Sequence, residues 1–216
     1  MIKLSNVNKK YGKLTVFENF SLDIEEGKIT CILGESGSGK TTILNMLAKL
    51  TDYSGEIECP SCSYVFQTPN LFPNMTVKQN LLLVNKDSQL VDEYLRKFRL
   101  EEKANSYPSQ LSGGQAQRVS LMRGLLYDKP LLLLDEPFSD LDIGLKFSLV
   151  ESVKKYHKES SKTIVMVTHD IKEAIVLADR IIVLSNGKIV HDEKTINEKT
   201  EEKLLGLLMG FYKQNN

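Results

Sequence analysis

Three predominantly apolar runs divide the chain, at residues 29–33, 131–134 and 163–167. Runs of this length without polar alternation are typical of strands buried on both faces, as in a parallel sheet. Apolar residues at helical spacing follow two of these runs, over residues 43–50 and 145–157. Buried strands that alternate with helices in this way predict an α/β core.

Both ends of the chain carry a different pattern, which predicts antiparallel strands. Residues 2–7 and 16–24 alternate apolar with polar, and a turn at Tyr11-Gly12 separates them. Near the carboxyl end, apolar residues on either side of Asn186-Gly187 predict a hairpin, because this dipeptide suits the tight turn between twisted strands. We therefore expect a mixed sheet and an antiparallel subdomain.

The middle of the chain, residues 67–127, shows no strand pattern. After a loop that contains two prolines, Thr76 is a suitable N-cap for a helix over residues 77–84. Helical spacing continues over residues 87–100 and 116–127. We predict one domain, residues 1–216, in which this helical lobe is inserted into a core lobe formed by residues 1–66 and 128–216.

A last amphipathic helix is predicted over residues 198–212, and it carries Leu204, Leu205 and Leu208. Its apolar face can bind a partner or pack on the chain's own core. We favour packing, which is the usual behaviour of an amphipathic helix.

The composition narrows the class of protein. Hydrophobic residues make up 41% of the chain and charged residues 26%, which is ordinary for a globular protein. The 28 basic residues equal the 28 acidic ones, so we expect no nucleic-acid partner. No apolar run is long enough to span a bilayer, so any role at a membrane is expected to come through a partner.

The chain has three cysteines, of which Cys59 and Cys62 are expected to be reduced thiols, with redox sensitivity as the alternative. Cys31 lies inside a predicted strand and is interpreted as a core residue. Cys59 and Cys62 lie between predicted strands at residues 55–58 and 63–66, which predicts a tight hairpin turn with two thiols. A zinc site would need two further ligands nearby, and the sequence has no second cluster.

The most specific motif runs from Gly34 to Thr41, between a predicted strand and a predicted helix. Its glycines allow main-chain amides to wrap an anion, and the positive end of the following helix lies beneath that anion. Lys40 would neutralise the outer phosphates, and the hydroxyl of Thr41 would ligate Mg²⁺. A glycine-rich connection without a ligand is the alternative, but the motif in this setting predicts that the chain binds a nucleoside triphosphate.

Polar residues follow the two later buried strands. Asp135 comes after four leucines, where a charge is costly without a cation, so we expect it to hold the metal. Glu136 is expected to face the attacking water as a general base, because successive side chains on a strand point in opposite directions. Helix caps at the surface are the alternative, which the neighbouring leucines disfavour. His169 ends the next strand, where ligands collect, although its position alone fits a structural histidine equally well.

Leu111-Ser112-Gly113-Gly114-Gln115, followed by Ala116-Gln117-Arg118, resembles the signature sequence of ABC transporter ATPases. The other motifs of that family occur in the family's order between residues 2 and 190: Tyr11 (A-loop), residues 34–41 (Walker A), Gln67 (Q-loop), residues 131–136 (Walker B), residues 139–142 (D-loop) and His169 (switch histidine). The resemblance implies an α/β P-loop NTPase core with a RecA-like mixed sheet, an antiparallel β-subdomain and an inserted helical subdomain.

The resemblance also implies ATP and Mg²⁺ as cofactors, and a homodimer in which each ATP lies between one chain's Walker A motif and its partner's signature. Glu136, His169 and Gln67 would be catalytic, and Thr41, Gln67 and Asp135 would hold the metal. The residues implied to bind the nucleotide are Tyr11, Gly34, Glu35, Ser36, Gly37, Ser38, Gly39, Lys40, Thr41, Thr42, Ser112, Gly113, Gly114 and Gln115.

Three positions depart from the usual pattern of the family: Lys49 after the Walker A helix, Asp140 in the D-loop, and Lys146 where arginine is frequent. Lysine and arginine differ in bidentate contacts, so these departures concern the dimer interface. The catalytic set is intact, which predicts an active ATPase.

Residues 65–67, residues 71–77 and Asn80 are similar to those of the nitrate/sulfonate/taurine branch of bacterial importers. This similarity implies an ATPase subunit that energises import, bound to permease subunits at the cytoplasmic face of the membrane, with or without an extracytoplasmic solute-binding protein. Three alternatives stay open: an ATPase for export, lipoprotein release or mechanotransmission, a soluble ABC protein that acts on ribosomes or DNA, and a sensor that does not hydrolyse ATP. The sequence does not identify the solute.

Overall fold

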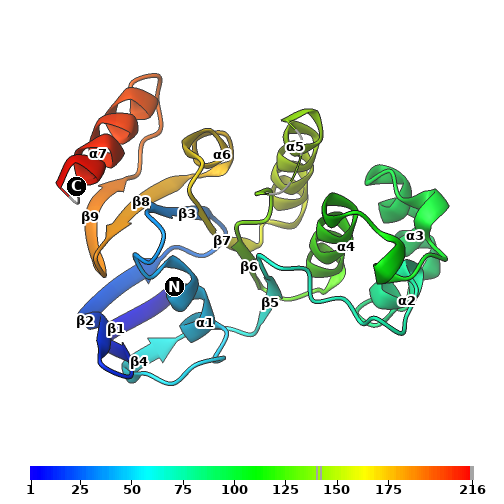
Figure 1. Cartoon of the computed structure of the whole chain (residues 1–216), viewed down its shortest axis with the longest axis horizontal. Coiled ribbons are helices and arrows are strands. Elements are labelled where there is room, and N and C mark those ends of the chain that lie inside the picture. Colours follow the sequence, from blue (N-terminus) through cyan, green and yellow to red (C-terminus); the bar gives the residue numbers. More distant parts are fainter. Residues whose placement is uncertain (140, 142, 215–216) are drawn as a thin grey trace.

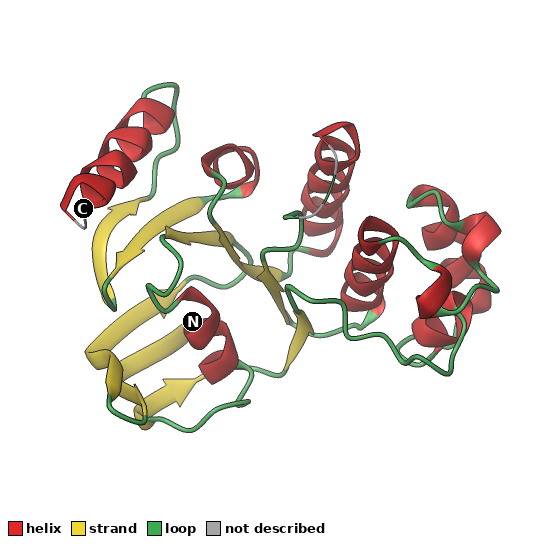
Figure 2. Ribbon diagram, viewed as in Figure 1, coloured by secondary structure: helices red, strands yellow, loops and turns green. Residues whose placement is uncertain are grey.

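The computed structural model describes residues 1–139, 141 and 143–214, which form two sheets and a set of helices (Figures 1 and 2). The strands are β1 (Ile2–Tyr11), β2 (Leu14–Ile24), β3 (Ile29–Gly34), β4 (Ser54–Glu58), β5 (Cys62–Val65), β6 (Leu131–Asp135), β7 (Thr163–Thr168), β8 (Arg180–Ser185) and β9 (Lys188–Glu193). The α-helices are α1 (Lys40–Leu47), α2 (Val77–Leu82), α3 (Ser88–Lys97), α4 (Gly113–Leu126), α5 (Ile143–Ser160), α6 (Ile171–Leu177) and α7 (Thr200–Gln214).

The larger sheet has the order β5-β6-β7-β3-β8-β9. Its strands β5, β6, β7, β3 and β8 are parallel, and β9 runs antiparallel to β8. The three apolar runs form its centre, where every residue of β3, β6 and β7 is buried. Asn186 and Gly187 both have positive φ, at 47° and 71°, as a tight hairpin turn requires. The predicted mixed sheet and the hairpin between β8 and β9 are confirmed.

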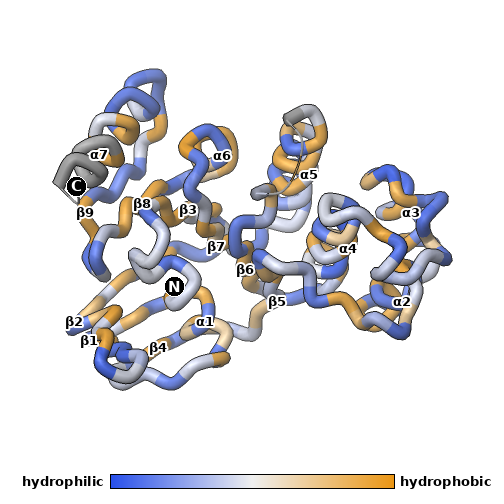
Figure 3. The backbone as a smooth tube through the Cα atoms, viewed as in Figure 1, coloured by the Kyte–Doolittle hydropathy of each residue, from blue (hydrophilic) through white to orange (hydrophobic). Residues whose placement is uncertain are grey.

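A second sheet, with the order β2-β1-β4, is entirely antiparallel and confirms the predicted subdomain. Helix α1 lies between this sheet and the larger one, whereas α5 and α6 cover the opposite face of the larger sheet (Figure 2). Apolar colour runs along the central strands in Figure 3, which matches their burial. The two layers of helices therefore make a three-layer core in which the carboxyl ends of the parallel strands meet at one edge.

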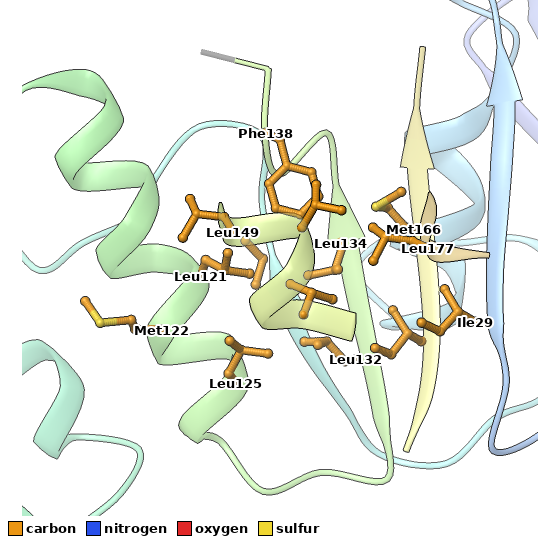
Figure 4. Close-up of a cluster of buried hydrophobic side chains, with 14 of the residues drawn as sticks. Ile29, Leu121, Met122, Leu125, Leu132, Leu134, Phe138, Leu149, Met166 and Leu177 are labelled. Carbon is orange, nitrogen blue, oxygen red and sulfur yellow. The ribbon is translucent and has the colours of Figure 1, made fainter. Parts of the chain in front are cut away.

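Residues 67–127, all of which the structure describes, contain helices and no strand, as predicted. Thr76 caps α2 by accepting a hydrogen bond from the amide of Gln79, and Asp87 caps α3 in the same way. Helix α4 begins at Gly113, three residues before the predicted start, because Ser112 provides its N-cap. Leu121 and Leu125 of α4 pack with Leu132 and Leu134 of β6 and join this helical segment to the sheet (Figure 4).

The predicted hairpin around Cys59 and Cys62 is wrong. Strand β4 pairs with β1 in the antiparallel sheet, whereas β5 pairs with β6 in the larger sheet. The short segment between β4 and β5 therefore passes from one sheet to the other. Cys59 in this segment and Cys62 at the start of β5 are half-buried free thiols. Cys31 is fully buried in the core, as predicted.

Helix α7 packs on the chain's own core, as favoured by its pattern. Leu204 is buried within the cluster that includes Ala174 and Leu177 of α6, and Leu208 is half-buried against the same cluster. Within the described residues no helix is both long and apolar enough to cross a membrane. Asp140 and Asp142 of the predicted D-loop lie outside the described residues.

Candidate nucleotide site

The phosphate loop connects β3 to α1 in a conformation that needs glycine. Gly37 and Gly39 have φ values of 80° and 106°, in the left-handed region, and Gly39 is the N-cap of α1. A Cβ atom on Gly39 would lie 2.6 Å from the ring of Phe17, and one on Gly34 would lie 2.3 Å from the carbonyl oxygen of Leu184. Close packing around the loop therefore requires glycine at positions 34 and 39, whether or not a ligand binds.

Lys40, the first residue of α1, is buried within this loop. Its ammonium donates hydrogen bonds to the carbonyl oxygens of Gly34 and Glu35, at 2.8 and 2.9 Å. Burial lowers the pKa of Lys40, while the carboxylates of Glu136, Asp135 and Glu35 act in the opposite direction. The loop therefore contains a cation that is poorly hydrated and suited to bind phosphate oxygens.

Asp135 lies behind the loop at the end of β6, with only 3% of its surface exposed. The hydroxyl of Thr41 donates to its Oδ1 at 3.0 Å, and the phenol of Tyr64 is 3.2 Å from its Oδ2. Burial raises the pKa of Asp135, although both hydrogen bonds oppose this effect. A hydroxyl and a buried carboxylate side by side are the hard oxygen donors that Mg²⁺ uses when phosphates and water complete its shell.

Glu136 follows β6 and turns sharply away from it. Its φ of 43° is in the left-handed region, and its amide donates to the carbonyl of Val167 at 3.0 Å. A turn after the strand, rather than the strand alternation that we assumed, separates Glu136 from Asp135. Oε2 of Glu136 lies 3.0 Å from Nδ1 of His169 and 3.5 Å from Nε2 of Gln67. Three segments far apart in the sequence thus meet at one carboxylate.

These residues surround one pocket of about 600 Å³. The phosphate loop, Glu136, Gln67 and His169 form its polar lining, and Tyr11, Leu14, Val16 and Leu208 form its apolar lining, called the apolar end below. The lining residues are Tyr11, Leu14, Val16, Gly34, Glu35, Ser36, Gly37, Gly39, Lys40, Thr41, Thr42, Gln67, Glu136, His169 and Leu208.

Leu14, Val16 and Leu208 were not predicted as site residues. The side chain of Leu14 is exposed beside that of Tyr11 at the apolar end, and Leu208 reaches the pocket from α7. A local signal for Leu14 and Val16 is that they follow Tyr11, a predicted site residue, across a short turn. No local signal could indicate Leu208, because α7 is brought to the pocket only by packing.

The predicted signature residues lie elsewhere. Ser112 and Gln115 form a capping box at the start of α4, in which each side chain accepts a hydrogen bond from the other residue's amide, at 3.3 and 2.9 Å. Ser112, Gly113, Gly114 and Gln115 do not line the pocket, and neither do Ser38 and Asp135. The structure thus brings the Walker motifs, Gln67, His169 and Tyr11 together and leaves the signature on a separate surface.

A phosphate loop between a parallel strand and a helix, with an acidic residue at the end of a neighbouring buried strand, defines the P-loop NTPase class. A family model described as "ABC transporter" matches residues 17–139. An aliphatic sulfonates import ATP-binding protein of Pseudomonas savastanoi pv. phaseolicola is 40% identical over 196 residues, which cover 88% of this chain and 73% of that protein.

A sulfate/thiosulfate import ATP-binding protein of Synechocystis sp. is 38% identical over 236 residues, which cover 100% of this chain and 66% of that protein. A solved dimeric structure of the ATP-binding cassette MJ0796, bound to ADP and Pi, aligns with a TM-score of 0.82 and 34% identity over 90% of this chain and 98% of that one. The chain therefore belongs to the ABC transporter family, as an ATP-binding subunit whose activity is ATP hydrolysis.

Proposed function

We propose that this chain hydrolyses ATP at the pocket between the phosphate loop and Glu136, and that two copies use this reaction to drive solute import. One observation carries the assignment of the site. Gln67 and His169 both contact Oε2 of Glu136, in a pocket that is also lined by the phosphate loop and its buried Lys40. This arrangement supplies phosphate binding and a general base in one pocket.

Each group then has a role that follows from its position. The loop amides and Lys40 would bind the phosphates, and Tyr11, with Leu14 and Leu208, would contact the base at the apolar end. Glu136 would accept a proton from the attacking water. His169 and Gln67 would orient the Glu136 carboxylate through the contacts described above, and both line the pocket in which the terminal phosphate and the water would lie.

Thr41 and Asp135 would hold Mg²⁺ together with phosphate oxygens and water. The support for a magnesium ion here is the 3.0 Å contact between the Thr41 hydroxyl and the buried carboxylate of Asp135. When bound, the ion would neutralise charge on the phosphates. The part of the chain that the structure describes contains no cluster of three or more histidine, cysteine or acidic residues that could hold a metal. The two donors Thr41 and Asp135 match a magnesium site that forms only with the nucleotide, whose phosphates supply further ligands.

The position of the signature supports a dimer. Ser112, Gly113 and Gly114 are at the amino end of α4, where main-chain amides can bind an anion, yet they are absent from the chain's own pocket. A second copy arranged head to tail would bring them to the terminal phosphate. Hydrolysis would then depend on closure of the dimer.

The test of the site is the substitution Glu136→Gln. An amide cannot accept the proton, so we expect ATP hydrolysis to fall at least about 100-fold, while binding of ATP with magnesium persists. Steady-state phosphate release and equilibrium ATP binding would be measured on the same preparation. Glu93→Gln, at an exposed carboxylate on α3, is the matched control and should hydrolyse normally. Retained hydrolysis in Glu136→Gln would refute the role of Glu136.

For import, the proposal is that the chain binds permease subunits at the cytoplasmic face of the membrane. The support is the similarity to import ATP-binding proteins for aliphatic sulfonates and for sulfate or thiosulfate. Purification of the tagged chain from detergent-solubilised membranes should yield a permease. In vesicles with that permease, an extracytoplasmic solute-binding protein should stimulate ATP hydrolysis. Recovery of a permease with a large extracytoplasmic domain and no binding protein would favour export or mechanotransmission instead.

A further inference from the structure

Tyr64 lies beside the buried carboxylate of Asp135, although it belongs to none of the motifs of the site. Its phenol oxygen is 3.2 Å from Oδ2 of Asp135 and 3.1 Å from Oδ1 of Asn45 on α1. The other carboxylate oxygen of Asp135 accepts the hydrogen bond from Thr41. Each oxygen of Asp135 therefore has one hydroxyl partner, and the two hydroxyls come from different elements.

The register of the sheet brings the phenol to this place. In the parallel pair of β5 and β6, Tyr64 is the neighbour of Leu133, which is two residues before Asp135 and so on the same face. Helix α1 covers this face and supplies Asn45. The ring of Tyr64 also stacks on Phe66, with centroids 4.0 Å apart and an angle of 17° between the planes. This stacking fixes the ring independently of its hydroxyl.

The phenol has a single proton, so it donates to only one of its two neighbours. Hydrogen bonds to an ionised acceptor are stronger than those to a neutral one, which assigns this proton to the carboxylate of Asp135. The structure places Oδ1 of Asn45 at the phenol, and a half turn of this amide would direct its NH₂ group there instead, so that the phenol accepts from Asn45 and donates to Asp135. Asn45 thereby orients Tyr64, and Tyr64 orients Asp135.

We propose that Tyr64 is a positioning residue for the magnesium site, and that its hydroxyl keeps Asp135 turned so that Oδ1 faces Thr41. The inference rests on the proposed function, because Asp135 is a metal ligand only there. The contact of its phenol with Oδ2 of Asp135 is the route by which Tyr64 would act on the metal. Its absence should therefore weaken magnesium binding without weakening binding of the free nucleotide.

Tyr64→Phe tests this role, because phenylalanine retains the stacking on Phe66 and removes only the hydroxyl. The full chain would be titrated with MgCl₂ at a fixed, subsaturating concentration of radiolabelled ATP, and retained ATP would be measured by filter binding. The same measurement in EDTA gives the affinity for metal-free ATP. We expect the magnesium concentration at half-saturation to rise about tenfold, the effect of losing one hydrogen bond to a charged group. The dissociation constant in EDTA should stay within about twofold.

Tyr94→Phe is the matched control, since Tyr94 is a half-buried tyrosine of α3 that stacks on Phe98 at 6.0 Å. It should leave both measurements unchanged. An unshifted magnesium titration for Tyr64→Phe would overturn the role of Tyr64, and so would an equal loss of affinity in EDTA. If the wild-type chain itself retained no ATP under either condition, the proposed function would be overturned as well, which separates the two failures.

Discussion

Lys146 shows how a single side chain connects two elements next to the site. Its ammonium, at the start of α5, lies 2.6 Å from a carboxylate oxygen of Asp170 and 2.5 Å from one of Glu173 on α6. Glu173 is only 4% exposed, and its other oxygen accepts a hydrogen bond from Thr168. Lys146, at a position where the family frequently has arginine, thus forms two ion pairs within this chain.

Lys146→Met should destabilise the fold by about 2–4 kcal/mol, because it leaves Glu173 buried without its cation. Urea unfolding at pH 7 measures the change in free energy. Lys172→Met is the matched control, since Lys172 is exposed on α6 and its ammonium forms no ion pair within the described residues. The control should change the free energy of unfolding by less than about 0.5 kcal/mol. Equal effects of the two substitutions would contradict this role of Lys146.

The ion pair between Lys146 and Asp170 predicts that the free energy of unfolding depends on pH. Burial by itself would raise the pKa of Asp170, but the hydrogen bond and charge of Lys146, with the amides of Glu173 and Lys172, bring it below the usual value. A carboxyl whose pKa is lowered by folding stabilises the folded state above its unfolded pKa of about 3.9, and this contribution disappears as the pH falls through the folded pKa. The stability difference between wild type and Lys146→Met should therefore shrink as the pH falls below about 4. A constant difference over that range would exclude the Asp170 contribution.

At the scale of elements, the helical segment joins the sheet through a close contact between α4 and β5. A Cβ atom on Gly124 would lie 2.3 Å from Cγ2 of Val65, which is fully buried and has a stiff, branched side chain. The hydroxyl of Ser63 donates to the carbonyl oxygen of Gly124 at 2.9 Å. The space between α4 and β5 therefore leaves no room for a side chain at position 124.

Gly124→Ala should destabilise the protein by about 1–2 kcal/mol, because overpacking exceeds the gain in helix propensity. Gly206→Ala is the matched substitution, on the exposed side of α7, where an added Cβ meets nothing within 4 Å. It should stabilise by about 0.5–1 kcal/mol. Thermal unfolding followed by circular dichroism would measure both, and shifts of the same sign would contradict the contact described for α4.

Most elements could be predicted because their signals are local. Thr76 and Asp87 mark helix starts, and Asn186-Gly187 marks a turn, through hydrogen bonds and φ values that involve only neighbouring residues. We predicted a hairpin between β4 and β5 because the segment that connects them is short enough for one, and this prediction was wrong. Which sheet each strand joins depends on partners that are distant in the sequence, β1 for β4 and β6 for β5, and no local pattern contains that information.

For the whole molecule, the separation of Ser112 from the pocket implies that the site is completed by a second copy. Because Ser112 also caps α4, a test must keep the cap. Aspartate and asparagine both cap helices, but only aspartate places a negative charge where the partner's terminal phosphate is expected. In the Glu136→Gln background with magnesium and ATP, Ser112→Asp should abolish the dimer in size-exclusion chromatography, whereas Ser112→Asn should retain it. Both should still bind ATP, and a dimer of Ser112→Asp would refute the arrangement.

The sequence by itself determined the class of protein and located the candidate residues of the site. The glycines, Lys40 and Thr41 occupy one short motif, and Asp135 and Glu136 follow one buried run, so residue type and spacing were enough to find them. The roles of these residues, and of Gln67 and His169, stay predictions.

Only the tertiary structure decided which distant side chains surround the site. Tyr64 and Asn45 reach Asp135 because β5 pairs with β6 beneath α1, and Leu208 reaches the apolar end because α7 packs on α6. Contacts of this kind depend on the register of strands and the packing of helices, which the whole chain settles together through burial of its core.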